Sequence, residues 1–142
     1  MPKRSAWSKK TRVLIVDDNT SDRLILRSML IAIGFSEIHE AEDGVMAENK
    51  IDVSKQIKQP FELVFVDWAM PKLNGLKLLQ RVRADKKHED LLVFMFTAKS
   101  QPEDVSDAAK SGVNEYLVKP LTLEVLRQKL LKHYEPQKAP VP

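Results

Sequence analysis

Three aspartates, one threonine and one lysine stand at the ends of short apolar runs in the sequence. They are Asp17 and Asp18, Asp67, Thr97 and Lys119. Three carboxylates in one small crevice would repel one another unless a cation shared them. A carboxylate-rich set without His or Cys suits Mg²⁺, which takes oxygen ligands and keeps several waters. Because such a metal can bridge an acidic cluster and a phosphoryl oxygen, phosphoryl transfer is the reaction that this set supports.

The same side chains can divide the work of that reaction. A carboxylate that attacks phosphorus forms an acyl phosphate, which is a known type of covalent intermediate. Thr97 can hydrogen-bond one phosphoryl oxygen, and Lys119 can neutralise another. Structural roles stay open as alternatives, because Asp17 with Asp18 can form a turn or cap a helix, and Thr97 can cap a helix.

The elements that would position these side chains alternate along the chain. Apolar runs at 13–16, 38–41, 63–66, 91–96 and 116–118 predict five buried strands, and the amphipathic stretches between them predict helices. Asn19, Thr20 or Ser21 can begin the first helix, and Gly34 ends it. Strands that alternate with helices predict an α/β fold whose parallel sheet is covered on both faces. Ligands of such sheets bind outside the carboxyl ends of the strands, so the five side chains should converge there.

Composition and charge limit the function classes. The chain has 142 residues, no cysteine and a net charge of +3, and none of its apolar runs approaches the roughly 18–20 residues that span a bilayer. Near the N-terminus lie five basic residues, Lys3, Arg4, Lys9, Lys10 and Arg12. The remainder has 18 basic against 20 acidic residues, so we interpret the excess as a solvated arm and not as a nucleic-acid site. Without a secretory signal or cysteines, the chain is expected in the cytoplasm.

The expected organisation is one domain between two terminal segments. Residues 1–10 form the basic arm, residues 11–133 the domain, and residues 134–142, with three prolines, a tail. The histidines, His39, His88 and His133, are isolated without the spacing of a metal site, so we do not expect metal binding through them.

The motifs at the strand ends also resemble a known family. These motifs are Val16-Asp17-Asp18, Asp67-Trp68-Ala69-Met70-Pro71 followed by Asn74-Gly75-Leu76, Thr97-Ala98, and Lys119-Pro120. In order and spacing they are similar to the receiver domain of two-component response regulators, from about Thr11 to Lys132. The stretch 40–49 and the loop after Asp67 look closest to stand-alone chemotaxis-type receivers. The resemblance implies a doubly wound (βα)5 flavodoxin-like fold with a five-stranded parallel sheet in the order 2-1-3-4-5.

The resemblance assigns a role to each matching position of the site. It implies that Asp67 accepts the phosphoryl group and that Lys119 contacts that group. It implies that Asp17 and Asp18 hold Mg²⁺, with Asp67 and the backbone carbonyl of Ala69 as further ligands.

The resemblance also implies a conformational switch. Thr97 would move toward the phosphoryl oxygens and Tyr116 would turn inward to fill the vacated space, although a half-buried core tyrosine is the structural alternative. The peptide bond between Lys119 and Pro120 is expected to be cis.

Two further positions, Ala69 and Lys99, match the places where receivers tune the hydrolysis of the acyl phosphate. Alanine cannot orient an attacking water, and a lysine can instead screen the phosphoryl charge, so we expect slow self-dephosphorylation. The chain would then be a phosphorylated switch with chemistry on itself only, and not an enzyme.

The family also indicates partners. A histidine kinase or phosphotransfer protein would donate the phosphoryl group. Only about 22 residues follow Pro120, too few for a DNA-binding output domain, so the expected output is a protein bound on the surface of helix 4, strand 5 and helix 5. The sequence does not choose between chemotaxis, another pathway and a phosphate sink.

Two other functions remain as alternatives, and a third is excluded. A haloacid-dehalogenase-type phosphatase also uses an aspartyl phosphate, but it needs an acid two residues after the nucleophile, where this chain has Ala69. A non-phosphorylated pseudo-receiver would act by interaction alone, but such proteins usually lose an acid or the lysine. Nucleotide binding is excluded because the first strand leads to Asp17 and Asp18 without a Gly-rich phosphate loop.

Overall fold

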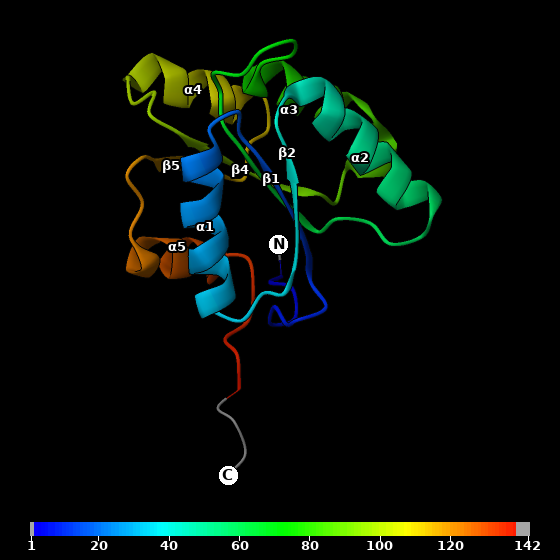
Figure 1. The fold of residues 1–142 in the computed structure, drawn as a ribbon, viewed down its shortest axis with the longest axis vertical. Helices are drawn as coiled ribbons and strands as arrows, with labels where there is room; N and C mark the ends of the chain where they lie inside the picture. The colour runs from blue at the N-terminus through cyan, green and yellow to red at the C-terminus, as the bar shows by residue number, and fades with distance from the viewer. Residues whose placement is uncertain (1, 139–142) are drawn as a thin grey trace.

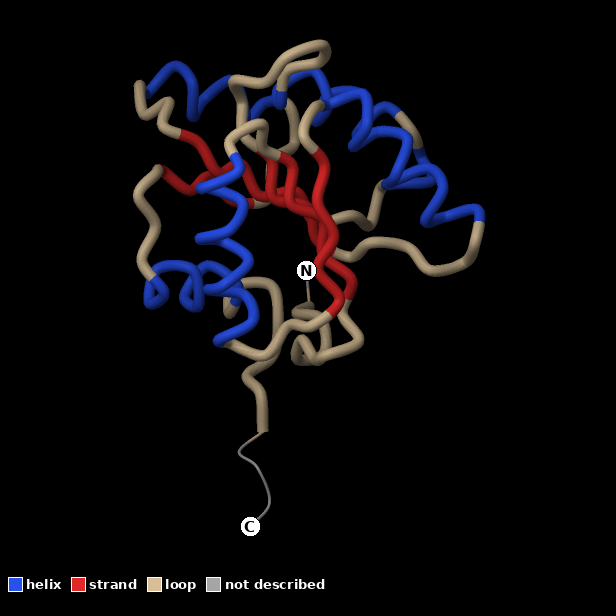
Figure 2. Tube along the Cα trace, in the orientation of Figure 1, coloured by secondary structure: helices blue, strands red, loops and turns tan. Residues whose placement is uncertain are grey.

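The computed structural model describes residues 2–138 and contains one five-stranded parallel sheet with the strand order β2-β1-β3-β4-β5. The strands are β1 (Arg12–Val16), β2 (Glu37–Ala41), β3 (Leu63–Val66), β4 (Leu92–Thr97) and β5 (Glu115–Val118). Figure 2 shows them side by side between two layers of helices. The predicted α/β class, the parallel sheet and its strand order are confirmed.

Helices cover both faces of the sheet, as Figure 1 shows. They are α1 (Thr20–Ala32), α2 (Gly44–Gln56), α3 (Gly75–Ala84), the short 3₁₀ helix η1 (Lys86–His88), α4 (Pro102–Lys110) and α5 (Leu123–Leu130). Apolar side chains of α1 and α5 share one core, and those of α2, α3 and α4 share the other. None of the helices in the described part of the chain is long and apolar enough to cross a membrane.

The central strands belong to both cores at once. In β1, Val13 and Ile15 pack on the side of α1 and α5, whereas Leu14 and Val16 pack on the side of α2 and α3. This alternation follows from the two-residue period of a strand, and it explains why the run is apolar throughout. A strand held on both faces has a fixed register, so the residue that follows it has a fixed position as well.

The N-terminal segment differs from the solvated arm that its charge predicts. Trp7 is only 4% exposed, stacks on Phe35 with ring centroids 5.6 Å apart, and donates from Nε1 to the backbone oxygen of Ile33. Its ring also packs edge-to-face with Tyr134, a residue of the predicted tail that is only 1% exposed. A bridge between Arg4 and Tyr134 joins the two segments.

The solvated interpretation is therefore wrong for these aromatic residues, although Lys3, Lys9 and Lys10 are exposed. The net charge of a segment reports its polar side chains, but burial of one large aromatic side chain decides where the backbone lies. The last part of the predicted tail, 139–142, lies outside the described residues.

Replacing Trp7 with alanine is expected to lower the free energy of unfolding by about 3 kcal/mol, since removal of a buried aromatic side chain leaves a cavity. Trp7→Phe keeps a ring against Phe35 but loses the hydrogen bond to Ile33, which costs about 1 kcal/mol. Urea unfolding followed by circular dichroism measures both. A loss for Trp7→Ala no larger than that for Trp7→Phe would show that the segment does not belong to the core.

Candidate functional site

The carboxyl ends of the strands bring the predicted residues to one edge of the sheet. Asp17 follows β1, and its backbone N–H donates to the oxygen of Ala41 in β2. Asp67 follows β3, and its N–H donates to the oxygen of Val16. Lys119 follows β5, and its N–H donates to the oxygen of Thr97 at 2.9 Å. Each functional residue thus continues the hydrogen-bond ladder by one step, which fixes its backbone relative to its neighbours.

The side chains of these residues meet at one nitrogen atom. The Nζ atom of Lys119 lies 2.7 Å from Oδ2 of Asp17 and 3.0 Å from Oδ2 of Asp67. Each distance is that of a charge-assisted hydrogen bond. The sequence separations are 102 and 52 residues, so only the folded sheet creates the contact.

Three carboxylates form an acidic cluster at this edge. Asp17, Asp18 and Asp67 each offer an oxygen, and the three oxygens lie within 4.8 Å of one another. Asp17 and Asp67 are 2% and 9% exposed, whereas Asp18 is exposed to solvent. This donor set fits Mg²⁺, which prefers oxygen ligands and retains water on its open side.

The electrostatics of the cluster also favour a cation. Burial raises the pKa of Asp17 above its ordinary value, and hydrogen bonds from Lys119 and from the Asn19 amide offset this only in part. Burial acts to lower the pKa of Lys119, but its hydrogen bonds to the surrounding carboxylates outweigh burial and raise this pKa. Lys119 therefore stays charged, and a second cation beside Asp17 would favour the ionised carboxylate.

A third carboxylate, that of Asp22, contacts Lys119 and is not among the site residues predicted from the sequence. Oδ2 of Asp22 lies 2.7 Å from Nζ of Lys119. Asp22 is in the first turn of α1, and its backbone N–H donates to the side chain of the N-cap residue Asn19. An acid three residues after a cap, next to a strand that ends in aspartates, is the signal that could have identified it.

Arg23 holds the loop that carries Asp17. Its guanidinium is buried and donates from Nη1 to the backbone oxygen of Asp17 at 2.7 Å. Its Nε donates to Glu40 on the neighbouring strand β2 at 2.9 Å. These two hydrogen bonds of Arg23 therefore fix the end of β1 against β2. The helical pattern of the sequence does not indicate them.

Gly75 allows the start of α3 to pack against the backbone of Asp67. A Cβ atom on Gly75 would lie 2.1 Å from the backbone oxygen of Asp67, so no other residue fits there without movement of the chain. The N–H of Gly75 donates to the oxygen of Trp68, and the N–H of Ala69 donates to Oδ1 of Asp67 at 3.3 Å. The start of α3 thus packs directly on the candidate acceptor.

The proposed switch residues, Thr97 and Tyr116, both form a hydrogen bond with the backbone of Lys99. Thr97 is the last residue of β4 and is buried, and its Oγ1 accepts from the N–H of Lys99 at 3.3 Å. The hydroxyl of Tyr116 donates to the backbone oxygen of Lys99 at 2.7 Å. Burial, with the negative charges of Asp104 and Asp67, raises the pKa of Tyr116 to about 12. Thr97 is not a helix cap, because Gln101 holds that position for α4.

The side chain of Lys99 is held away from the cluster by two contacts. Its Nζ lies 4.9 Å from the centroid of the Trp68 ring and 3.7 Å from Oδ1 of Asp104. The residue two positions after Thr97 therefore covers the indole next to Asp67. The peptide bond between Lys119 and Pro120 is cis.

Together these groups can perform one kind of chemistry. Asp67 offers a carboxylate oxygen beyond the end of β3, and Lys119 offers an ammonium 3.0 Å from it. A carboxylate nucleophile beside a fixed cation can attack an electrophile that carries negative oxygens, such as a phosphoryl group.

Comparison with known proteins identifies the family. The model of the response regulator receiver domain matches residues 13–131. The chain is 40% identical over 119 residues to the chemotaxis protein CheY homologue of Campylobacter jejuni, covering 84% of this chain and 88% of that protein. It is 39% identical over 128 residues to chemotaxis protein CheY-3 of Vibrio cholerae, covering 90% of this chain and 95% of that protein.

A solved structure gives the same result for the fold. A chain of the CheX–CheY–BeF3–Mg²⁺ complex of Borrelia burgdorferi matches with a TM-score of 0.76 and 28% identity, covering 85% of this chain and 87% of that chain. The haloacid-dehalogenase and pseudo-receiver alternatives are not favoured by these matches. The chain therefore belongs to the response-regulator receiver domain family and is homologous to stand-alone CheY-type regulators.

Proposed function

We propose that the protein is a single-domain response regulator that accepts a phosphoryl group on Asp67. The observation that carries this proposal is the position of the Lys119 ammonium, within 3.0 Å of both Asp17 and Asp67 at the open edge of a parallel sheet. A carboxylate oxygen of Asp67 forms the new bond to phosphorus, and the bond from phosphorus to the donor's leaving group breaks. The bonding electron pair departs with that leaving group.

Mg²⁺ is the cofactor that the donor set fits. Asp17, Asp18 and Asp67, with the backbone carbonyl of Ala69, would hold it. When bound, it would neutralise charge on the phosphoryl oxygens. Lys119 would orient the remaining phosphoryl oxygens, and a cation beside Asp17 would favour the ionised form of that carboxylate.

The proposed output is a change of the surface formed by α4, β5 and α5. Val105, Val118, Leu123 and Val125 are exposed apolar side chains on these three elements. Exposed apolar side chains on this surface suit the docking of a partner protein. We propose that Thr97 and Tyr116 couple it to Asp67, since the Tyr116 hydroxyl is bonded to the loop that follows Thr97.

The proposal includes a setting and a class of partner. Receiver domains are signalling switches and are not usually classed as enzymes. We propose a cytoplasmic protein that takes its phosphoryl group from a histidine kinase or a phosphotransfer protein and then binds a downstream protein. A pathway related to chemotaxis is supported by the CheY relatives from Campylobacter jejuni and Vibrio cholerae.

The fluorescence of Trp68 tests this function. The indole is next to Asp67 and under the ammonium of Lys99, so Mg²⁺ and then acetyl phosphate should each change its emission. Trp7→Phe removes the other tryptophan and keeps the ring stack on Phe35. A response to Mg²⁺ without any response to acetyl phosphate would contradict phosphoryl acceptance and would instead favour a pseudo-receiver.

Dephosphorylation should become faster when Ala69 and Lys99 are exchanged for asparagine and glutamate. An amide can orient the attacking water that alanine cannot, and the carboxylate would no longer cover the indole of Trp68. We expect the loss of phosphate, timed by Trp68 fluorescence after donor removal, to accelerate about tenfold or more. Lys110→Glu on α4 makes the same charge change away from the site and should leave the rate unaltered. An unchanged or slower decay in the double variant would contradict the assigned tuning role.

A further inference from the structure

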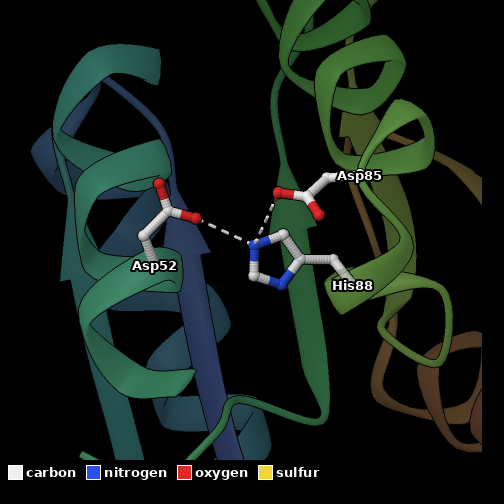
Figure 3. A group of neighbouring side chains, drawn as sticks. All are labelled: Asp52, Asp85 and His88. Atoms are coloured by element: carbon white, nitrogen blue, oxygen red, sulfur yellow. Dashed lines mark hydrogen bonds and ion pairs between the residues drawn. The ribbon is translucent and has the colours of Figure 1, made fainter. Parts of the chain in front are cut away.

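A second cluster of ligand-type side chains lies between α2 and the segment that leads into β4. Asp52 lies on α2, Asp85 follows α3 and caps η1, and His88 ends η1. Figure 3 shows the imidazole of His88 pointing from η1 toward both carboxylates. His88 is only 5% exposed, and each of the three residues offers one ligand atom within 4.8 Å of the others.

One imidazole nitrogen faces both acids. Nε2 of His88 lies 2.8 Å from Oδ1 of Asp52 and 3.9 Å from Oδ2 of Asp85 (Figure 3). Two ligands bound to one tetrahedral zinc ion at 2.0–2.1 Å stand roughly 3.3 Å apart. The two observed distances lie on either side of that value. On binding a metal ion, the distance from Nε2 of His88 to Asp52 would have to lengthen and the distance to Asp85 would have to shorten, each by less than about 1 Å.

The surroundings leave space and solvent access for further ligands. A surface hollow is lined by these three residues together with Glu48, Ile51, Arg81 and Val82. The carboxylates of Asp52 and Asp85 are partly exposed, so water can complete a coordination sphere from outside. The guanidinium of Arg81 in the lining donates to Glu48 at 2.9 Å, and the ammonium of Lys87 lies 3.7 Å from Oδ2 of Asp85, where a metal ion would have to displace it.

The ligand types decide which ion is expected. Imidazole nitrogen suits Zn²⁺ and similar transition-metal ions, whereas Mg²⁺ prefers ligands that are all oxygen atoms. We propose that Asp52, Asp85 and His88 form a binding site for a divalent transition-metal ion of the zinc type, completed by water. This site is separate from the Asp17, Asp18 and Asp67 cluster, because His88 precedes β4 while the acidic cluster lies beyond the carboxyl ends of the strands.

A bound ion would connect three elements. α2 and α3 meet in the structure, and η1 packs on the end of α3. Asp52 lies on α2, and Asp85 and His88 lie in the segment that follows α3. The ion would therefore stabilise the layer of helices over one face of the sheet, since a ligand that binds only the folded state raises the unfolding temperature.

Zinc titration of the intact protein in a large excess of Mg²⁺ tests the proposal, because Mg²⁺ then occupies the acidic cluster. Isothermal titration should give one Zn²⁺ per chain, and the ring ¹⁵N resonances should shift for His88 but not for His39 or His133. The variant Asp52→Asn should weaken binding on the order of tenfold or more. The variant His88→Gln should abolish it, while His39→Gln and His133→Gln should leave it intact.

Asp52 is a partly exposed residue on the surface of α2, so Asp52→Asn provides a folded variant even if His88→Gln is destabilised. Zinc binding that survives both substitutions, or ring shifts confined to His39 and His133, would overturn the proposal. So would the absence of saturable binding at micromolar Zn²⁺, because the cluster would then be an ion pair alone.

Discussion

Replacing Asp67 with asparagine is expected to abolish phosphorylation by acetyl phosphate, with a loss of about a thousandfold or more in the rate of phosphoryl incorporation. Asparagine has nearly the same shape, and its Oδ1 can still accept from the Ala69 amide. It has no anionic oxygen to attack phosphorus, however. Its amide would also present a donor to Lys119, so the contact at 3.0 Å would be lost.

Phosphate incorporation is measured by intact-mass spectrometry in Mg²⁺, and Trp68 fluorescence is recorded in parallel. The variant Asp107→Asn is the matched control, because Asp107 is an exposed aspartate on α4 that belongs to none of the contacts of the site. It should be phosphorylated at the rate of the unaltered chain. Incorporation in Asp67→Asn at a rate near that of the control would remove Asp67 from the role of acceptor.

Replacing Lys119 with methionine is expected to separate metal binding from phosphorylation. The ammonium lies 2.7 Å from both Asp17 and Asp22 and 3.0 Å from Asp67, so its removal leaves three carboxylates without their shared partner. Mg²⁺ should then bind severalfold more tightly, since a competing cation beside the cluster is gone. Phosphorylation should nevertheless slow by about a hundredfold, because the ammonium that would contact a phosphoryl oxygen is gone.

Titration of Trp68 emission with Mg²⁺ and the rate of emission change with acetyl phosphate measure the two effects. The same variant should gain more thermal stability from Mg²⁺ than the unaltered chain does, because the ion would replace the missing ammonium beside the carboxylates. Lys119→Arg keeps the charge and changes its shape, so it should retain the Mg²⁺ affinity of the unaltered chain. A methionine variant that is phosphorylated at an unaltered rate would contradict the contact between Lys119 and the phosphoryl group.

The convergence of Asp17, Asp67 and Lys119 could be predicted because it depends on regular structure alone. Each residue directly follows a buried strand, and parallel strands end at the same edge of a sheet. The sequence therefore needs to specify only the strand ends. Thr97 is expected beside Lys119 because it also ends a strand, and in the structure the N–H of Lys119 donates to the oxygen of Thr97.

Asp22 and Arg23 could not be found in this way, because both lie in α1 at positions that the helical pattern treats as solvent-facing or neutral. The direction of a helical side chain toward a neighbouring strand depends on how the helix packs, and the pattern does not contain that information. Asp22 bonds to Lys119 and Arg23 to the Asp17 carbonyl only after α1 has packed beside β1.

The burial of Trp7 and the contacts of His88 could not be predicted, for a different reason. The charges around Trp7 carry no information on its burial, and His88 lacks the sequence spacing of a metal site. Its partner Asp52 is 36 residues away on α2, and only the packing of α2 beside α3 brings the two together. Contacts between helices depend on the tertiary fold, so spacing along the chain neither predicts nor excludes them.

The chemical identity of the phosphorylated side chain is the most direct test of the central claim. The protein is incubated with Mg²⁺ and acetyl phosphate and then reduced with borohydride, which converts an aspartyl phosphate to homoserine. Peptide sequencing by tandem mass spectrometry then locates the homoserine. We predict homoserine at position 67 and at no other aspartate. Homoserine at another position, or none in a protein that has bound Mg²⁺, would contradict the assignment of Asp67 as the phosphoryl acceptor.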